Sequence, residues 1–230
     1  MKIDILTLFP EFFQNLKQYS IVGRAIEEDK ISIDTTNIRD FSKNKHKKVD
    51  DYPFGGGPGM VMKPEPIYDA INSLKKDNSR IIYLSPQGKV LNQNIANLLA
   101  KEEHLILLCG HYEGIDNRII DNFVDEEISI GDYVLTGGEI PAMVLIDCIS
   151  RLIPGVLSSE ASFMEESHYD GLLEHPQYTR PREFMGIEVP DILLSGNHEK
   201  IHSWRKEQAL KVTKAKRPDL LEIDEKGLNK

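Results

Sequence analysis

The chain alternates between short apolar runs and longer amphipathic segments. Met1–Leu8 alternates apolar and polar side chains and predicts a strand, whereas Glu11–Asp29 has apolar residues three to four positions apart and predicts a helix. Further strands are predicted at Ile31–Ile38, Arg80–Leu84, Leu105–Cys109 and Ile128–Ile130, and further helices at Pro64–Lys75, Asn92–Glu103, Ile115–Phe123 and Pro141–Leu152. Residues Arg39–Met62 predict a long loop, basic first and then rich in glycine. Strands that alternate with helices are typical of an α/β domain with a largely parallel sheet.

The pattern changes after Pro154-Gly155, which ends the last apolar helix. Residues 1–157 are therefore predicted to form the α/β domain. Residues 158–182 lack clear periodicity and are rich in Ser, Glu, His and Pro, which predicts a flexible interdomain linker. Residues 183–230 predict a small, mainly helical C-terminal domain, in which Asn197 caps a helix over Glu199–Lys214 and Pro218 opens a last short one.

Composition narrows the class of protein. The chain has 230 residues, of which 40% are hydrophobic, so it can bury a core without disulfides. Cys109 and Cys148 both lie in apolar runs and are interpreted as buried thiols of a reducing compartment. The longest apolar segment, Ile140–Leu157, is interrupted by two charged side chains and is too short and polar to span a bilayer. A cytoplasmic protein without a membrane partner is expected.

Charge is unevenly placed along the chain. The net charge of −9 argues against a binder of nucleic acid that ignores sequence, because such proteins carry a basic face. Two basic clusters nevertheless occur, at Lys43–Lys48 and Arg205–Arg217. Each taken alone predicts only a solvated surface. A specific nucleic-acid binder remains compatible with this distribution.

Three successive predicted strands end in loops that contain glycine, namely Leu84–Gly88, Cys109–Gly114 and Ile130–Gly138. Because ligands of open α/β sheets gather beyond the carboxyl ends of the strands, we predict that these loops form one small-molecule site lined mostly by backbone. The chain contains neither the phosphate-binding G-x-x-x-x-G-K-[ST] motif nor G-x-G-x-x-G after a strand. The predicted ligand is therefore something other than a phosphate.

Several long motifs in these loops and elsewhere resemble those of the bacterial tRNA (guanine-N1)-methyltransferases, which belong to the SPOUT class. The resemblance extends in order from LFPEFF near the start of the chain to Leu221. The motifs are YPFGGGPGM (Tyr52–Met60), YLSPQG (Tyr83–Gly88), LCGHYEGID (Leu108–Asp116), IGDYVLTGGE (Ile130–Glu139), YTRP (Tyr178–Pro181) and LLSGNH (Leu193–His198) followed by Trp204-Arg205.

The resemblance implies a parallel-sheet domain with a trefoil knot, a homodimer, and S-adenosylmethionine bound bent inside the knot. It further implies methylation of N1 of guanine-37, the nucleotide 3′ to the anticodon, with the tRNA anticodon stem-loop as partner. Substrate contacts would come from Pro58, Gly59, Arg180 and the basic C-terminal helix. A loosely held Mg²⁺ is compatible with the family, although the sequence shows no ligand set. By the same resemblance, the cofactor-binding residues would be Leu84, Ser85, Pro86, Gly110, Ile130, Gly131, Asp132, Tyr133, Val134, Leu135, Gly137, Gly138 and Pro141.

The chemistry of this reaction calls for an acid group and a cation. Guanine N1 carries a proton at neutral pH, so a general base must remove it, and a cation should stabilise the negative charge that builds on O6. The resemblance assigns these roles to Arg151 and to an Asp of the linker, whose position is occupied here by Glu166. Glu has the same acid group on a longer arm. Asp170, four residues further on, is the alternative base.

Two other functions are compatible with parts of the sequence. His198–His202 reads H-E-x-x-H, the signature of zinc proteases, but Asn197 is predicted to cap this helix and so puts His198 in its first turn. Residue 205, where the extended protease motif has glycine, is Arg205. The other alternative is a non-enzymatic module that binds RNA or a nucleotide in the same pocket.

Overall fold

The computed structural model describes residues 1–157 and 166–221. The chain forms two compact units, Met1–Ser158 and Ser159–Lys230. Within the described ranges, no helix combines the length and the apolar composition needed to cross a bilayer.

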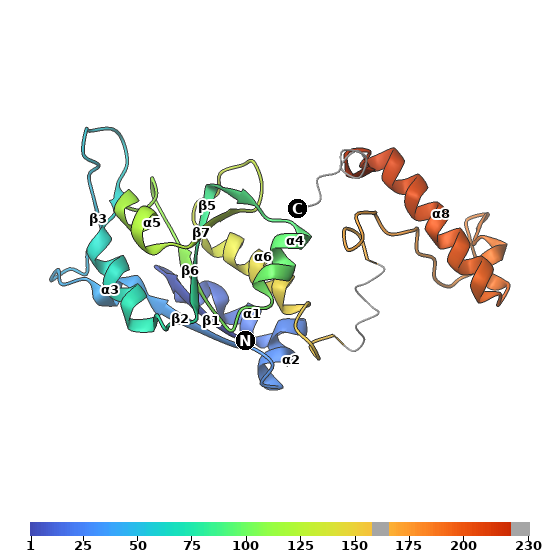
Figure 1. Ribbon diagram of the computed structural model, residues 1–230, viewed down its shortest axis with the longest axis horizontal. Helices are drawn as coiled ribbons and strands as arrows, with labels where there is room; N and C mark the ends of the chain where they lie inside the picture. The colour runs from blue at the N-terminus through green and yellow to red at the C-terminus, as the bar shows by residue number, and fades with distance from the viewer. Residues whose placement is uncertain (158–165, 222–230) are drawn as a thin grey trace. The chain divides into compact units, whose positions relative to one another are not determined.

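The first unit is built on a five-stranded sheet with the order β2-β1-β6-β5-β7 (Figure 1). Every neighbouring pair in this sheet is parallel, which confirms the predicted α/β architecture. Each predicted strand is present with bounds shifted by a few residues, except that β5 continues well past its predicted end. The strands are β1 Lys2–Thr7, β2 Ser32–Asn37, β5 Ser79–Val90, β6 His104–Cys109 and β7 Glu126–Ser129.

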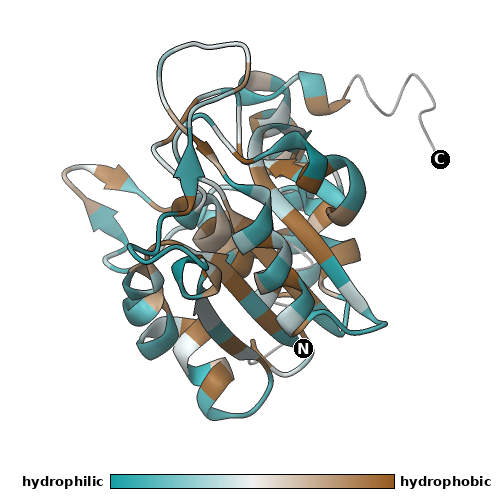
Figure 2. Cartoon of the chain, turned by 90° about the vertical axis from the view of Figure 1, so that its left-hand side faces the viewer, coloured by the Kyte–Doolittle hydropathy of each residue, from teal (hydrophilic) through white to brown (hydrophobic). Residues whose placement is uncertain are grey.

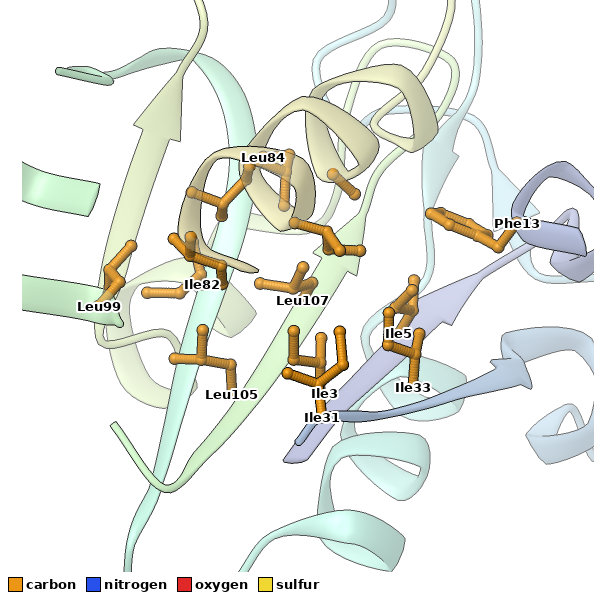
Figure 3. Close-up of a cluster of buried hydrophobic side chains, with 14 of the residues drawn as sticks. Ile3, Ile5, Phe13, Ile31, Ile33, Ile82, Leu84, Leu99, Leu105 and Leu107 are labelled. Atoms are coloured by element: carbon orange, nitrogen blue, oxygen red, sulfur yellow. The ribbon is translucent and has the colours of Figure 1, made fainter. Parts of the chain in front are cut away.

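Helices cover both faces of this sheet. Helices α2 (Ser20–Glu27), α4 (Gln93–Leu99) and α6 (Glu139–Ser150) pack on one face, and α3 (Pro64–Leu74) and α5 (Asn117–Phe123) on the other. Successive strand residues point to opposite faces, so β6 sends Leu105 and Leu107 into one core and Ile106 into the other. Figure 3 shows the first core and Figure 2 shows how hydrophobic residues concentrate in the strands.

The prediction of one helix over Glu11–Asp29 is wrong. The segment forms a 3₁₀ turn, η1 (Pro10–Phe13), a short helix, α1 (Gln14–Gln18), and then α2. Tyr19 between the two helices is extended, and Ser20, the first residue of α2, has a φ of 64°, a left-handed conformation that interrupts a continuous right-handed helix. Apolar spacing continues across this break, so periodicity alone did not reveal it.

The prediction of a single long loop over Arg39–Met62 is also partly wrong. A 3₁₀ turn, η2 (Ile38–Phe41), opens the segment, and β3 (Asp50–Asp51) pairs antiparallel with β4 (Val61–Met62). Strands of two residues are too short to show an alternating pattern. They are held by contacts with distant residues, as when the Met62 amide donates to the Gly114 carbonyl (2.9 Å).

The second unit contains the predicted long helix, α8 (His198–Lys216), together with a hairpin of β8 (Glu183–Phe184) and β9 (Ile187–Glu188) and a 3₁₀ turn, η3 (Asp191–Leu194). The hairpin was not predicted. The Leu173 amide donates to Thr213 Oγ1 of α8 (2.8 Å). The linker assigned to residues 158–182 stays a prediction, and its first part, 158–165, lies outside the described residues.

Candidate functional site

The three glycine-containing loops surround one cavity at the carboxyl edge of the sheet. Strands β5, β6 and β7 end at the same level because Leu84 pairs with both Cys109 and Ile128. Of the residues assigned to a cofactor by resemblance, all but the exposed Asp132 line this cavity: Leu84, Ser85, Pro86, Gly110, Ile130, Gly131, Tyr133, Val134, Leu135, Gly137, Gly138 and Pro141. Sequence reasoning did not assign the other lining residues, although all lie in or next to the same loops: Tyr83, Gln87, His111, Tyr112, Glu113, Gly114, Ile128, Ser129 and Thr136.

The first loop is an excursion within a single strand. Strand β5 leaves the sheet after Leu84 and returns at Lys89, which pairs with the same residue, Ile128. Gly88 makes this return possible, because a Cβ there would lie 2.5 Å from the backbone nitrogen of Ile128. The predicted strand ended at Leu84, since the excursion looks like an ordinary loop in sequence.

The second and third loops are joined directly to each other. The Gly138 amide donates to the Gly110 carbonyl (3.0 Å), and His111 and Gly137 form an isolated antiparallel bridge. A Cβ on Gly138 would lie 2.7 Å from the Cα of Cys109, so only glycine allows the two loops to approach this closely. Helix α6 starts at Glu139, which makes Pro141 its third residue and not its first as predicted.

A buried hydrogen-bond network fixes this junction to β1. The carboxylate of Glu139 is 2% exposed and accepts a hydrogen bond from Thr7 Oγ1 (2.5 Å). His111 Nε2 lies 2.8 and 2.9 Å from the two oxygens of the same carboxylate, and the His111 ring stands edge-on to Phe9 at 4.9 Å. The first turn of α6 also favours a negative charge. The network connects residues 7, 111 and 139, which no local sequence pattern relates.

We expect Glu139→Gln to lower the free energy of unfolding by about 1.5–3 kcal/mol, the usual range for a buried hydrogen bond to a charged group. Urea denaturation followed by circular dichroism measures this loss. Glu65→Gln is the matched control, because Glu65 also lies in the first turn of a helix but is exposed. Equal effects of the two substitutions would show that the network contributes nothing beyond helix electrostatics.

Tyr83 forms part of the cavity wall in an almost dry environment. Its side chain is 6% exposed, and its hydroxyl would lie 2.8 Å from a Cβ on Gly110. Burial, followed by the nearby charge of Glu127, raises the pKa of Tyr83 from 10.0 to about 12. The phenol is therefore a neutral group at physiological pH.

This raised pKa predicts a loss of stability in alkali. Between pH 10 and 12 the unfolded chain has released the Tyr83 proton while the folded chain retains it, so the unfolded state binds fewer protons and stability falls as pH rises. Titration of tyrosinate absorbance should show one phenol with a pKa near 12 that is missing in Tyr83→Phe. If Tyr83→Phe leaves the titration curve of the folded protein unchanged above pH 11, the assignment is wrong.

The glycine-rich loop Tyr52–Met60 is attached to the rim of the cavity. The Glu113 amide of the second loop donates to the Met60 carbonyl (3.0 Å), and a Cβ on Gly59 would overlap the Glu113 side chain. Pro58 and Gly59, assigned to substrate by resemblance, are exposed there. They therefore lie on the loop that adjoins the cavity.

The residues assigned to catalysis, and Arg180 assigned to substrate, are divided between the two units. Arg151 directly follows α6 in the first unit, while Glu166, Asp170 and Arg180 belong to the second. Glu166 and Asp170 share one short turn, in which the Tyr169 amide donates to the Glu166 carbonyl (3.3 Å) and the Leu172 amide donates to Asp170 Oδ1 (3.3 Å). Glu166 is partly buried and Asp170 is exposed, as is Arg180.

The H-E-x-x-H segment lies where the capping signal predicted. Helix α8 begins at His198, and Asn197 caps it by accepting a hydrogen bond from the Lys200 amide (3.1 Å). Across residues 1–157 and 166–221, no group of three His, Cys, Asp or Glu side chains is arranged to hold a metal ion. The described residues thus offer no support for a zinc site or for the expected Mg²⁺.

Comparisons with known proteins cover almost the whole chain. The family model described as tRNA (Guanine-1)-methyltransferase TrmD matches residues 1–223. A tRNA (guanine-N(1)-)-methyltransferase of Ruminiclostridium cellulolyticum is 62% identical over 223 residues, which cover 96% of each chain. Proteins with the same name from Clostridioides difficile and Finegoldia magna are 60% and 56% identical, over 96% of this chain and 97% and 94% of theirs.

Proposed function

Because the chain belongs to the tRNA (guanine-N1)-methyltransferase family, we propose that it methylates N1 of guanine-37 in tRNA with S-adenosylmethionine as donor. The observation that carries this proposal is the cavity between the three strand-end loops, in a chain that matches the family over residues 1–223. The expected product is m1G37.

The lining of the cavity suits this donor. Among the described residues, the lining includes the acidic residue Glu113 and no Lys or Arg. Such a lining disfavours a phosphate and favours a ligand with a positive centre, as a sulfonium is. Glycines at positions 110, 131, 137 and 138 let the loops pack closely against neighbouring protein atoms, so that main chain forms much of the cavity wall. When bound, S-adenosylmethionine supplies an electrophilic methyl group.

Glu166 is proposed to act as the general base for guanine N1, and Arg151 to stabilise the negative charge that develops on O6. The Glu166 carboxylate accepts the N1 proton, which makes the N1 electron pair available, and the Arg151 guanidinium stabilises the negative charge on O6. Arg151 follows the last residue of α6, whereas Pro141 in the first turn of the same helix lines the cavity, so the role of Arg151 is proposed from the family resemblance. Asp170, on the same turn as Glu166, is the alternative base.

The guanine must leave its stack for a side chain to reach N1. The anticodon loop is single-stranded, which lowers this cost. Pro58, Gly59 and Arg180, together with the basic residues of α8, are proposed to bind the anticodon stem-loop; all three named residues are exposed. An acidic protein can bind RNA in this way if its basic surface is confined to one region.

The trefoil knot and the homodimer of the family are part of the proposal. The hydrogen bond between Gly138 and Gly110 joins the third loop to the second, and the knot itself is proposed from the family resemblance. Helix α6 leaves Ile140 and Val144 on its exposed side, and Val134 of the third loop is also exposed. An apolar surface at this place supports the burial of α6 against a second copy. Cytoplasmic location follows from tRNA as substrate.

The proposal is tested by incubating the protein with an unmodified tRNA transcript and labelled S-adenosylmethionine. Digestion and mass spectrometry should identify 1-methylguanosine at position 37, and a transcript with adenosine at that position should remain unmethylated. Calorimetry measures the affinity for the donor and its demethylated product separately. Donor binding and tRNA binding without methyl transfer would favour the non-enzymatic module.

A further inference from the structure

Two aromatic side chains stand exposed on the loop beside the cavity. Phe54 is 100% exposed and Tyr52 is 77% exposed. Single exposed apolar residues are common on protein surfaces, but a fully exposed Phe next to an exposed Tyr on one loop is less so. The pair presents aromatic faces to solvent at the edge of the site.

The backbone of the loop Tyr52–Met60 projects these rings into solvent. Gly55, Gly56 and Gly57 have φ values of 87°, 78° and 122°, and a Cβ on any of them would meet nothing within 4 Å. These glycines serve backbone conformation, not close packing. The ends of the loop are fixed, because Asp50 pairs with Met62 and Asp51 with Val61. The loop is therefore fixed at both ends and projects into solvent between them.

Part of a nearby basic cluster can meet a polyanion. The cluster Lys43–Lys48 precedes the loop, with Val49, Asp50 and Asp51 between them. Three of its lysines pair with carboxylates, whereas Lys45 and His46 are exposed. At its other end the loop is hydrogen-bonded to the cavity rim through Met60 and Glu113. Aromatic faces combined with nearby cations are the usual means of binding unpaired nucleotides.

We propose that Phe54 stacks on an unpaired base of the anticodon loop that flanks the target guanine. The proposal rests on the proposed function, because it takes tRNA as the substrate. Extrusion of the guanine leaves its neighbour without a stacking partner, and the Phe54 ring supplies one. Stacking accepts any base, so this contact adds affinity without sequence specificity, and Tyr52 flanks the same position.

The test compares Phe54→Ala, Phe54→Leu and Phe54→Trp in steady-state methylation of tRNA. We expect Ala and Leu to lower kcat/KM for tRNA by about 5- to 150-fold, from the usual strength of one stacked base, mainly through KM. Trp should retain activity, because it keeps an aromatic face. Donor affinity should be unchanged in all three. Tyr19→Ala is the matched control, since Tyr19 is 66% exposed and lies between α1 and α2 on the other face of the sheet.

A second readout does not need catalysis. Anticodon stem-loops with 2-aminopurine at either nucleotide flanking the target guanine are mixed with protein and S-adenosylhomocysteine, and stacking on Phe54 should quench the fluorescence at one of them. Phe54→Leu should abolish this quenching. Wild-type kcat/KM in Phe54→Leu, or no quenching by wild-type protein that methylates tRNA, overturns the stacking proposal alone. Absence of 1-methylguanosine with wild-type protein overturns the proposed function instead.

Discussion

Glu166→Ala is expected to reduce the rate of methyl transfer by about 10²- to 10⁴-fold, the range for a positioned general base. Arg151→Ala is expected to reduce it by about 10²- to 10³-fold, the range for one group that stabilises developing negative charge. Without the Glu166 carboxylate the guanine N1 proton has no acceptor, and without the Arg151 guanidinium the charge on O6 is left to the solvent. Single-turnover rates at saturating donor and tRNA isolate this step. Donor affinity measured by calorimetry should change little in Glu166→Ala, because Glu166 is absent from the cavity lining.

Two further variants test whether the loss of rate is specific to the carboxylate of Glu166. Glu165→Gln removes the neighbouring acid in the sequence and should retain activity, so it controls for a general loss of negative charge. Asp170→Ala should likewise retain most of the rate. If Glu166→Ala retains full activity and Asp170→Ala loses it, the base is Asp170. Asp170 is the alternative base that this experiment must exclude, because it shares the turn of residues 166–172 with Glu166.

The sheet and the position of the cavity were predictable because both depend on local signals. Each strand of the sheet is a short apolar run, and parallel strands place their carboxyl ends at one edge. The glycines at positions 110, 137 and 138 marked the loops correctly, although the sequence did not show that Gly138 meets the backbone of Cys109. Local patterns thus located the site but not its internal contacts.

Features that depend on distant residues were not predictable. The acid at position 139 looks like an ordinary residue of a first helical turn, and only the fold brings Thr7 and His111 to it. Similarly, the return of β5 to Ile128 depends on a partner strand nearly forty positions later in the chain. The helix break at Ser20 comes from the positive φ of this residue, which the spacing of apolar residues does not reveal. The roles of Glu166 and Arg151 came from the family resemblance and from the chemistry of guanine, not from periodicity.

Gly138→Ala is expected to weaken binding of S-adenosylmethionine by about 5- to 150-fold, which corresponds to the 1–3 kcal/mol that overpacking usually costs. Gly138 has a φ of −83°, so alanine fits its backbone conformation, and the cost comes only from the overlap with Cys109. Because Cys109 ends a central strand of the sheet, the third loop must move away instead. That movement lengthens the hydrogen bond from Gly138 to Gly110 and opens the cavity. Calorimetry with the donor measures the effect.

Gly186→Ala separates this local effect from a general loss of stability. Gly186 has a φ of 80° and open space around it, so alanine there is strained by its backbone alone. It lies between β8 and β9 in the second unit, and donor affinity should stay at the wild-type value. Thermal unfolding of both variants shows whether each remains folded at the temperature of the titration. Unchanged donor affinity in folded Gly138→Ala would mean that the junction of the second and third loops does not shape the donor site.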